Sequence, residues 1–483
     1  PDSIIDLELS IARLKFDEHL FLQLLMALRR SSIKRINTKP FSIGGNKEKI
    51  IINNLGFELT NAQKRVIKDI NNDIAGNSAM NRLLQGDVGC GKTIVAVITA
   101  VVAVENNMQV AIMAPTEILA YQHYKSFIKY LDMVQISCAL IVGKQNKSEK
   151  EKILSALKDG KINVVIGTHA LIQKTVNFNN LGLIVVDEQH RFGVIQRGNL
   201  LNKGVQPHLL AMTATPIPRT MAITYHGDMD LSIIDEMPKN RKKIITKVVN
   251  DKRLLKVYDF MKDEISCGRQ CIIVYPLVEE TKKSDLAAAT EGFEKLKKVF
   301  KNINLGLIHG KMKKLEKDAI MDQFVNNTIN ILVSTTVIEV GIDVPNASVI
   351  LIEHSERFGL TQLHQLRGRV GRGSAKSYCI LVERKITQNS KIRLEVLEKT
   401  SDGFIIADED LKMRGPGKFF STEQSGFFKY KLADMINDGA LIRKARSGAQ
   451  RIVDKDPKLK NHELMKQRLL NDYSQYFDTI NIT

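Results

Sequence analysis

The stretch LLQGDVGCGKTIVAVITAVVAV, residues 83–104, joins a short apolar run to a longer one through a glycine-rich loop. Gly86, Gly91, Lys92 and Thr93 have the spacing of a phosphate-binding loop, in which backbone N–H groups converge on phosphate oxygens at the start of a helix. In such a loop the lysine neutralises phosphate charge and the threonine hydroxyl holds Mg²⁺. The pattern therefore predicts a strand, a loop and a helix that together bind ATP with Mg²⁺. The residues expected to contact the nucleotide in this loop are Gly86, Asp87, Val88, Gly89, Cys90, Gly91, Lys92 and Thr93.

Two adjacent acids end another apolar run, LGLIVVDEQH at 181–190. A run of this kind predicts a buried strand, so its acids lie at the carboxyl end of that strand. One carboxylate in this position orders a metal ion through its water shell, and the next can activate a water molecule for attack. We predict Asp187 as the Mg²⁺ residue and Glu188 as the general base.

Short apolar runs alternate with helical stretches over most of the chain. Near-continuous apolar strands alternating with helices are typical of a parallel sheet that is covered on both faces. The runs in the first half are LLQG, VAIMAPT, CALIVG, NVVIGTH, LIVVDE and LLAMTAT, and those in the second half are CIIVYP, LGLIHG, NILVSTT, VILIEH and YCILVE. Between the two sets, DEMPKNRKK at 235–243 has the proline and the basic cluster of an exposed linker. The sequence therefore predicts an α/β chain with two parallel-sheet domains in tandem.

Helical patterns flank these two domains. Over residues 3–30, Ile4, Leu7, Ile11 and Leu14 recur at three- and four-residue spacing, which predicts a helix with one buried face. The segment after about residue 391 lacks strand runs and has the pattern of helices with charged faces. We predict four parts: a helical linker segment at 1–40, an ATP-binding domain at 41–236, a second α/β domain at 237–390 and a helical hairpin with a tail at 391–483.

The second predicted domain supplies arginines, in QLHQLRGRVGRG at 362–373. Guanidinium groups set among glycines in this way stabilise negative charge on a phosphoryl group that is being transferred. We predict Arg369 and Arg372 as arginine fingers. Just upstream, TTVIEVGIDVP carries Gly341 and Asp343 after a predicted strand, where a loop can touch the nucleotide.

Two residues ahead of the glycine-rich loop are candidates for binding the base. The carboxamide of Gln63 can donate and accept hydrogen bonds at once, so it can read the edge of adenine. Phe57 either stacks on the base or packs in the core, and the sequence favours neither alternative.

Composition limits the class of protein. A chain of 483 residues is long enough for about three domains. Its net charge of +18 favours a polyanionic partner, although a basic protein without nucleic acid has the same balance. Five scattered cysteines do not form a disulfide framework and favour the reducing cytoplasm, and Cys267 and Cys271 lack the second pair of a zinc site. The longest early apolar run, LFLQLLMAL, is about half a membrane span, so we expect no membrane partner.

Seven segments over about residues 57–373 resemble, in this order, the superfamily 2 helicases and translocases. These segments are GDVGCGKT, APTEILAYQHY, IGTHALI, VVDEQHRFG, TATPIPRT, STTVIEVGIDVP and QLHQLRGRVGRG. Within the superfamily, DEQHRFGV, MTATPIPRT and EHSERFGLTQLHQLRGRVGRG look like the RecG family of ATP-dependent DNA helicases, and the transcription-repair coupling factors share most of them. The resemblance implies two RecA-like motor domains and ATP-driven movement on branched DNA (replication forks, Holliday junctions) in bacterial recombination and repair.

The resemblance also implies roles for individual residues. His190, Thr213, Thr215 and Gln365 fall on motifs that family members use to couple hydrolysis to movement. Segments that line the DNA path in the family contain Thr116, Thr168 and His169, whose hydroxyls and backbone N–H groups would grip phosphates. The same residues serve equally well as caps at the ends of strands and helices.

The late stretch DGFIIADEDLKMRGPG, residues 402–417, resembles the translocation motif of RecG and the coupling factors. Glycine and proline end its helix and permit a tight loop, and Arg414 would transmit domain closure to DNA. The sequence departs from the family pattern at Lys418, Ser421 and Glu423, which puts the coupling in question but not ATP binding.

RecG carries an oligonucleotide-binding wedge domain ahead of its motor, whereas this chain begins at Pro1 in what resembles the linker helix that follows that domain. We therefore expect the wedge to be absent and, unless it is supplied elsewhere, the specificity for forks to be weak. Three alternatives stay open: a truncated RecG-like ATPase with little fork remodelling, a duplex translocase of the coupling-factor type, and an RNA helicase. The chain has no heptad repeats, so a monomer is expected, and a contact with a single-strand-binding protein is left open.

Overall fold

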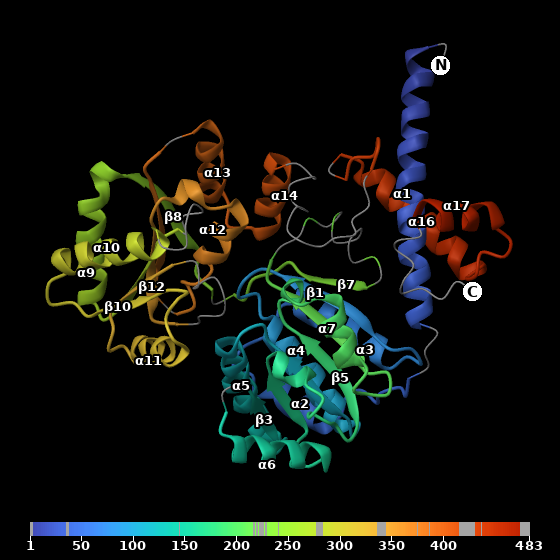
Figure 1. Ribbon diagram of the computed structural model, residues 1–483, viewed down its shortest axis with the longest axis horizontal. Helices are drawn as coiled ribbons and strands as arrows, with labels where there is room; N and C mark the ends of the chain where they lie inside the picture. Colours follow the sequence, from blue (N-terminus) through green and yellow to red (C-terminus); the bar gives the residue numbers. More distant parts are fainter. Residues whose placement is uncertain are drawn as a thin grey trace.

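The fold was obtained as a computed structural model of the chain. It describes residues 3–34, 38–143, 145–215, 218, 221, 227, 229–239, 241–276, 284–335, 344–373, 375–385, 387–414, 430–435 and 437–473. Figure 1 shows three parts: a first sheet with its helices, a second sheet with its helices, and α1 beside α16 and α17.

The first sheet has seven parallel strands in the order β3-β4-β2-β5-β6-β1-β7. Its strands are β1 Asn81–Gly86, β2 Gln109–Met113, β3 Cys138–Ile141, β4 Val164–Gly167, β5 Leu181–Val186, β6 His208–Thr213 and β7 Asp230–Ile234. The helices around it are α2 Asn46–Asn53, α3 Asn61–Ile74, α4 Lys92–Glu105, α5 Glu117–Leu131, α6 Lys147–Lys158 and α7 Val194–Leu201. Because successive strand residues point to opposite faces, Ile112 packs with α4 in one core cluster and Met113 packs in the other.

The second sheet has six parallel strands in the order β10-β11-β9-β12-β13-β8. Its strands are β8 Ile244–Asn250, β9 Gln270–Val274, β10 Leu305–Ile308, β11 Ile331–Ser334, β12 Ala347–Ile352 and β13 Ser377–Glu383. Its helices are α9 Leu254–Ser266, α10 Ser284–Val299, α11 Lys314–Val325, α12 Leu360–Arg367 and α13 Gln388–Lys399. Two core clusters again cover opposite faces of the sheet.

The predicted class, two parallel α/β domains in tandem, is confirmed. The sequence patterns missed β7 and β8, which flank the predicted linker at 235–243. Both strands lie at the end of their sheet, and only one of the seven residues of β8 is buried. An edge strand of this kind lacks the continuous apolar run by which the central strands were recognised.

Helices from the two ends of the chain pack together. These are α1 Ile4–Lys34, α16 Gly439–Lys455 and α17 Glu463–Tyr473, and α14 Gly403–Arg414 lies against α12 and α13 instead. Phe21, Leu24 and Leu25 of α1 share a buried cluster with Ala449 and Val453 of α16. An ion pair between Arg30 of α1 and Asp230 of β7 joins this helical unit to the first sheet.

The predicted helix at residues 3–30 is confirmed, and its second half is buried, but the four apolar residues predicted to be buried in its first half are not. Ile4, Leu7, Ile11 and Leu14 have exposed fractions of 77%, 46%, 37% and 51%. In Figure 1 the first half of α1 extends past α16. Helical spacing places these side chains on one face, but it does not decide whether another element covers that face.

Two predictions from composition can be compared with the structure. All five cysteines are free, as expected. Among the residues that the structure describes, no helix is both long and apolar enough to cross a bilayer.

The buried histidine of β6 makes the stability of the first domain depend on pH. His208 is fully buried, its Nδ1 accepts a hydrogen bond of 2.9 Å from the Met80 N–H, and burial lowers its pKa from 6.5 to about 4. Below pH 6.5 the unfolded chain gains a proton at this residue that the folded chain does not accept. We therefore expect the free energy of unfolding to fall by about 1.4 kcal/mol per pH unit from about pH 6.5 to about 4.

Urea denaturation between pH 7.5 and 5 tests this expectation. His208→Gln keeps an acceptor for Met80 but cannot titrate, so its stability should fall less steeply with acid than that of the wild type. His169→Gln, at an exposed position, is the matched control and should keep the wild-type slope. Equal slopes for His208→Gln and the wild type would contradict the assignment.

Candidate active site

The glycine-rich loop connects β1 to α4 as the sequence predicted. Gly89 and Gly91 have φ angles of 80° and 90°, in the left-handed region that favours glycine. A Cβ atom at Gly91 would also collide with Nε2 of Gln63, which donates a hydrogen bond of 2.9 Å to the Cys90 carbonyl. Glycine is therefore required at Gly91 both by backbone conformation and by space.

Lys92, the first residue of α4, points into its own loop. Its Nζ donates hydrogen bonds to the carbonyls of Gly86 and Asp87, at 2.7 and 3.0 Å. A phosphate group near the loop would compete for this ammonium. Cys90 is buried, and burial raises the pKa of its thiol, which keeps the thiol protonated and out of contact with solvent.

A second cation approaches the same loop from the linker. The Arg241 guanidinium donates a hydrogen bond to the Val88 carbonyl and lies against Gly89. The linker is thus not simply exposed, because one residue of its basic cluster contacts the glycine-rich loop.

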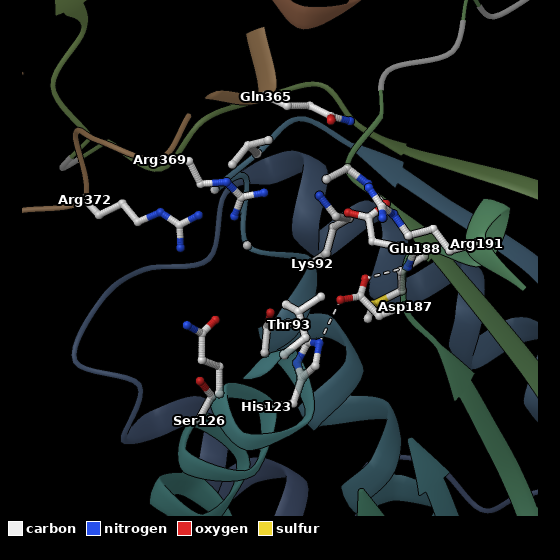
Figure 2. Close-up of a pocket in the computed structure, with 17 residues that line it drawn as sticks. Lys92, Thr93, His123, Ser126, Asp187, Glu188, Arg191, Gln365, Arg369 and Arg372 are labelled. Atoms are coloured by element: carbon white, nitrogen blue, oxygen red, sulfur yellow. Dashed lines mark hydrogen bonds and ion pairs between the residues drawn. The ribbon is translucent and has the colours of Figure 1, made fainter. Parts of the chain in front are cut away.

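Asp187 follows β5 and is held by a histidine from α5. Its Oδ2 lies 2.8 Å from Nε2 of His123, and its Oδ1 accepts a hydrogen bond of 3.0 Å from the Glu188 N–H (Figure 2). Burial by itself would raise the pKa of Asp187. The hydrogen bond and the charge of His123, together with the charge of Lys92, outweigh that effect and hold the pKa below its usual value.

The pKa of the neighbouring Glu188 is shifted in the opposite direction. Burial and the charge of Asp187 raise its pKa. Its φ angle of 49° is uncommon for a residue with a side chain, and its Oε2 accepts a hydrogen bond of 3.3 Å from the Ala214 N–H. The pair therefore combines one carboxylate kept ionised with another that has a higher affinity for protons, as a metal residue beside a general base requires.

One cavity of about 270 Å³ brings the predicted residues of both domains together. From the first domain Lys92, Thr93, Asp187 and Glu188 line it, and from the second domain Arg369, Arg372 and Gln365 do so (Figure 2). The remaining lining residues are Val88, Gly89, Gly91, Leu119, Gln122, His123, Ser126, Arg191, Met212 and Ala214. A cavity with four cationic side chains and two acids suits a polyphosphate with a divalent metal.

The oxygen donors of the cavity fit Mg²⁺. Asp187 has been kept ionised in spite of its burial, and the Thr93 hydroxyl lines the same space. Within the described residues no group of three or more His, Cys, Asp or Glu side chains is arranged to hold a metal. Mg²⁺ at nucleotide sites takes most of its oxygens from phosphate and water and needs only one or two from the protein.

Three family models match the chain. They are the DEAD/DEAH box helicase at 60–223, the helicase conserved C-terminal domain at 250–374, and the C-terminal part of domain 3 of the ATP-dependent DNA helicase RecG at 400–475. The ATP-dependent DNA helicase RecG of Bacillus subtilis is 44% identical over 94% of this chain and 67% of its own length. The chain belongs to the RecG family.

Other members of the family are longer than the present sequence. RecG of Synechocystis sp. is 46% identical over 98% of this chain but only 57% of its own length. A solved structure of RecG bound to a three-way DNA junction is 46% identical, with a TM-score of 0.76 over 92% of this chain and 58% of that chain. The chain thus spans a little under three fifths of these two relatives.

Several predicted nucleotide contacts of this RecG-family chain lie away from the cavity. Phe57 is largely exposed, and Gln63 is buried with its amide bonded to the backbone of Cys90 and Thr60. Neither residue lines the cavity, and the same holds for Gly86, Asp87 and Cys90 of the loop. Gly341 and Asp343 lie outside the described residues.

The predicted coupling residues form a connected path where they are described. The Thr215 N–H donates to the Thr213 hydroxyl at 3.1 Å, and Nε2 of Gln365 donates to the Thr215 hydroxyl at 2.9 Å. The path links the first domain directly to α12 of the second, and Ala214 within it bonds to Glu188. The side chains of His190 and Arg414, and the whole of Lys418, Ser421 and Glu423, lie outside the described part of the chain.

The three predicted DNA contacts differ in exposure. Thr116 caps α5 by accepting a hydrogen bond of 3.3 Å from the Leu119 N–H, which is the structural alternative that its sequence left open. Thr168 is buried, so its hydroxyl is not placed to reach DNA in this structure. His169 is exposed at the start of a short helix, His169–Ile172.

Sequence patterns missed four polar or charged residues of the cavity. Gln122, His123 and Ser126 come from α5, and Arg191 follows the acidic pair. Gln122 and His123 fall within the segment APTEILAYQHY, which was recognised only as a family motif, and Ser126 lies just beyond it. The contact between His123 and Asp187 joins positions 64 residues apart in sequence, so no local sequence pattern predicts it.

The glycine requirement at Gly91 can be tested directly. Gly91→Ala should weaken binding of a fluorescent ATP analogue, because a left-handed backbone costs a non-glycine residue about 1–2 kcal/mol, or roughly tenfold in affinity. The collision with Gln63 adds to this loss. Gly198→Ala in α7, where an added Cβ meets no atom within 4 Å, is the matched control and should bind normally. Unchanged affinity in Gly91→Ala would refute the assigned loop geometry.

Proposed function

We propose that this chain hydrolyses ATP and uses the energy to move on duplex DNA at branch points such as replication forks and Holliday junctions, in recombination and repair. The observation that carries the proposal is the shared cavity, in which the glycine-rich loop and acidic pair of one motor domain face two arginines of the other. Membership of the RecG family supports the DNA substrate, and so does the similarity to a RecG structure bound to a three-way junction.

Six residues of the cavity have a proposed part in hydrolysis. Lys92 binds phosphate oxygens, and Thr93 and Asp187 hold Mg²⁺, which supplies neutralising charge to the phosphates when bound. Glu188, with its raised proton affinity, accepts the proton of the attacking water. Arg369 and Arg372 add positive charge from the second domain, so the site is complete only when the two domains are together.

Movement requires that the cavity influence the rest of the motor. The path from Glu188 through Ala214 and Thr215 to Gln365 supports a coupling role for the motifs that contain them. We assign His190 and Arg414 to the same coupling on the resemblance of their motifs to those of the family. DNA contacts by Thr116 and His169 are proposed on the same ground. Nucleotide contacts by Phe57, Gln63, Gly341 and Asp343 are proposed from the chemistry of these residues and their places in the sequence.

The four-part division of the chain at residues 40, 236 and 390 is also a proposal. It is supported by the two sheets, whose strands fall within 81–234 and 244–383. We further propose a monomer in the bacterial cytoplasm, at the nucleoid, as the free cysteines and the bacterial relatives suggest.

The substrate is tested by ATPase rates without nucleic acid and with single-stranded RNA, linear duplex DNA and a three-way junction. We expect the junction and the duplex to stimulate hydrolysis and RNA to have little effect. DNA affinity should fall with salt by about 0.9 log units per log unit of salt for each phosphate contact. Equal rates in all four conditions would overturn the coupling to DNA.

Lys92→Ala should lower the ATPase rate by about 100-fold or more, because it removes the charge that binds the phosphates. DNA affinity, measured by fluorescence anisotropy, should be retained. Lys161→Ala removes an exposed lysine at a distance from the cavity and should behave as the wild type. Hydrolysis at the wild-type rate in Lys92→Ala would exclude this cavity as the active site.

The hydrogen bond between Gln365 and Thr215 should affect coupling more than binding. Thr215→Val removes the acceptor at similar volume, and one hydrogen bond is worth about 0.5–1.5 kcal/mol, so DNA-stimulated hydrolysis should fall about two- to tenfold. ATP affinity should change little. The double variant with Gln365→Ala should be no worse than the worse single variant, whereas additive losses would show that the two residues act separately.

A further inference from the structure

A buried contact between the two motor domains lies behind the cavity. Nε2 of His364, on α12, is 2.6 Å from Oδ1 of Asp87 in the glycine-rich loop. Both side chains are buried, and neither lines the cavity that holds the charged residues. This contact therefore joins the loop to the second domain without taking part in the chemistry.

The partners of His364 fix its hydrogen-bonding direction. Its Nδ1 lies 2.9 Å from Nη2 of Arg367, and a guanidinium group can only donate. Nδ1 must then accept, so the proton of the neutral imidazole is on Nε2 and is donated to Asp87. His364 thus links the guanidinium group of Arg367 to the carboxylate of Asp87 through two hydrogen bonds.

Arg367 extends this chain to the end of the next helix. Its Nη1 donates to the carbonyls of Leu397 and Thr400, each at 2.9 Å, where α13 ends. Three residues later Gly403 begins α14, the helix that leads into the predicted translocation motif. Arg367 is therefore a structural residue of the second domain and does not line the cavity.

The first residue of α14 lies directly on the contact. A Cβ atom at Gly403 would be 2.7 Å from Nε2 of His364 and 2.9 Å from Oδ2 of Asp87. No side chain fits there, although the backbone of Gly403 is an ordinary one for other residues. The start of α14 also carries the positive end of the helix dipole, which favours the carboxylate of Asp87.

The glycine-rich loop can transmit its state through Asp87. The Asp87 carbonyl accepts a hydrogen bond of 3.0 Å from Lys92, and its carboxylate accepts one of 2.6 Å from the Val88 N–H. A phosphate that draws Lys92 away from this carbonyl removes one of the hydrogen bonds that hold Asp87 in place. The position of the Asp87 side chain against His364 and Gly403 must then change. The response reaches α14 without passing through Arg369 or Arg372.

We propose that Asp87, His364 and Gly403 form a junction that positions the start of α14 according to the phosphate state of the glycine-rich loop. His364 is a positioning residue in this junction. The inference rests on the proposed function insofar as α14 serves movement, but the response of α14 to nucleotide does not itself require that DNA be moved.

The test is hydrogen exchange of the backbone amides of α14, measured by mass spectrometry on the full chain with and without a non-hydrolysable ATP analogue. In the wild type, exchange at the start of α14 should change by at least severalfold when the analogue binds. Gly403→Ala should abolish that change while affinity for the analogue and basal ATPase stay within about twofold of the wild type. DNA-stimulated hydrolysis should fall at least fivefold.

Two substitutions of His364 separate its two contacts. His364→Gln can place a donor near the position of Nε2 and keep the bond to Asp87, whereas His364→Asn can keep only an acceptor for Arg367. We expect the response of α14 to survive largely in His364→Gln and to be lost in His364→Asn. This ordering depends on the contact with Asp87, and general damage to the buried site would not produce it.

Gly448→Ala in α16 is the matched control, because the nearest atom to an added Cβ is 3.7 Å away, at ordinary contact distance. It should leave exchange and hydrolysis unchanged. If thermal unfolding shows that Gly403→Ala is unfolded, the two His364 variants decide the outcome. A wild-type response of α14 in both Gly403→Ala and His364→Asn would overturn the inference. A normal response of α14 in a chain that DNA does not stimulate would refute the proposed function and leave the junction standing.

Discussion

The arrangement of three neighbouring parallel strands, β5, β6 and β1, determines the site. Parallel strands present all their carboxyl ends at one edge of the sheet, so the loops that follow them lie side by side. These loops carry the acidic pair, the Thr213–Thr215 segment and the glycine-rich loop, in that spatial order. The order differs from the order in sequence, because β1 comes first in the chain but lies beyond β6 in the sheet. The hydrogen bond from Ala214 to Glu188 is a direct result of this adjacency.

Charge balance explains why the cavity needs both domains. Lys92 and Arg191 accompany two acids in the first domain, and Arg369 and Arg372 give the cavity its excess of positive charge. Asp187, the proposed Mg²⁺ residue, is kept ionised largely by His123 of its own domain, so its charge does not depend on the second domain. The positions of Arg369 and Arg372 do depend on the second domain. The hydrogen bonds of His364 and Gln365 to the first domain fix the distance between α12 and the cavity.

Local patterns predicted the central strands, the glycine-rich loop, the acidic pair and the two arginines, because each is a contiguous stretch whose chemistry is set by neighbouring residues. Edge strands β7 and β8 were missed, since partial exposure removes the apolar run. Pairs such as His123 with Asp187 and His364 with Asp87 were also missed. Their members lie 64 and 277 positions apart, and only the folded chain brings them within hydrogen-bond distance. The first half of α1 was wrongly predicted to be buried, because helical spacing shows that apolar residues share a face but not that another element covers this face.

The end of α14 and the chain from Tyr430 onward are attached to different parts of the molecule. Helix α14 packs on α12 and α13 of the second domain, whereas the chain from Tyr430 onward is held by α1. Glu18 of α1 accepts hydrogen bonds from the backbone of Lys431 and Ala433, and α1 is ion-paired to β7 of the first sheet through Arg30. Any change in the angle between the two sheets must therefore alter the distance between the end of α14 and Tyr430.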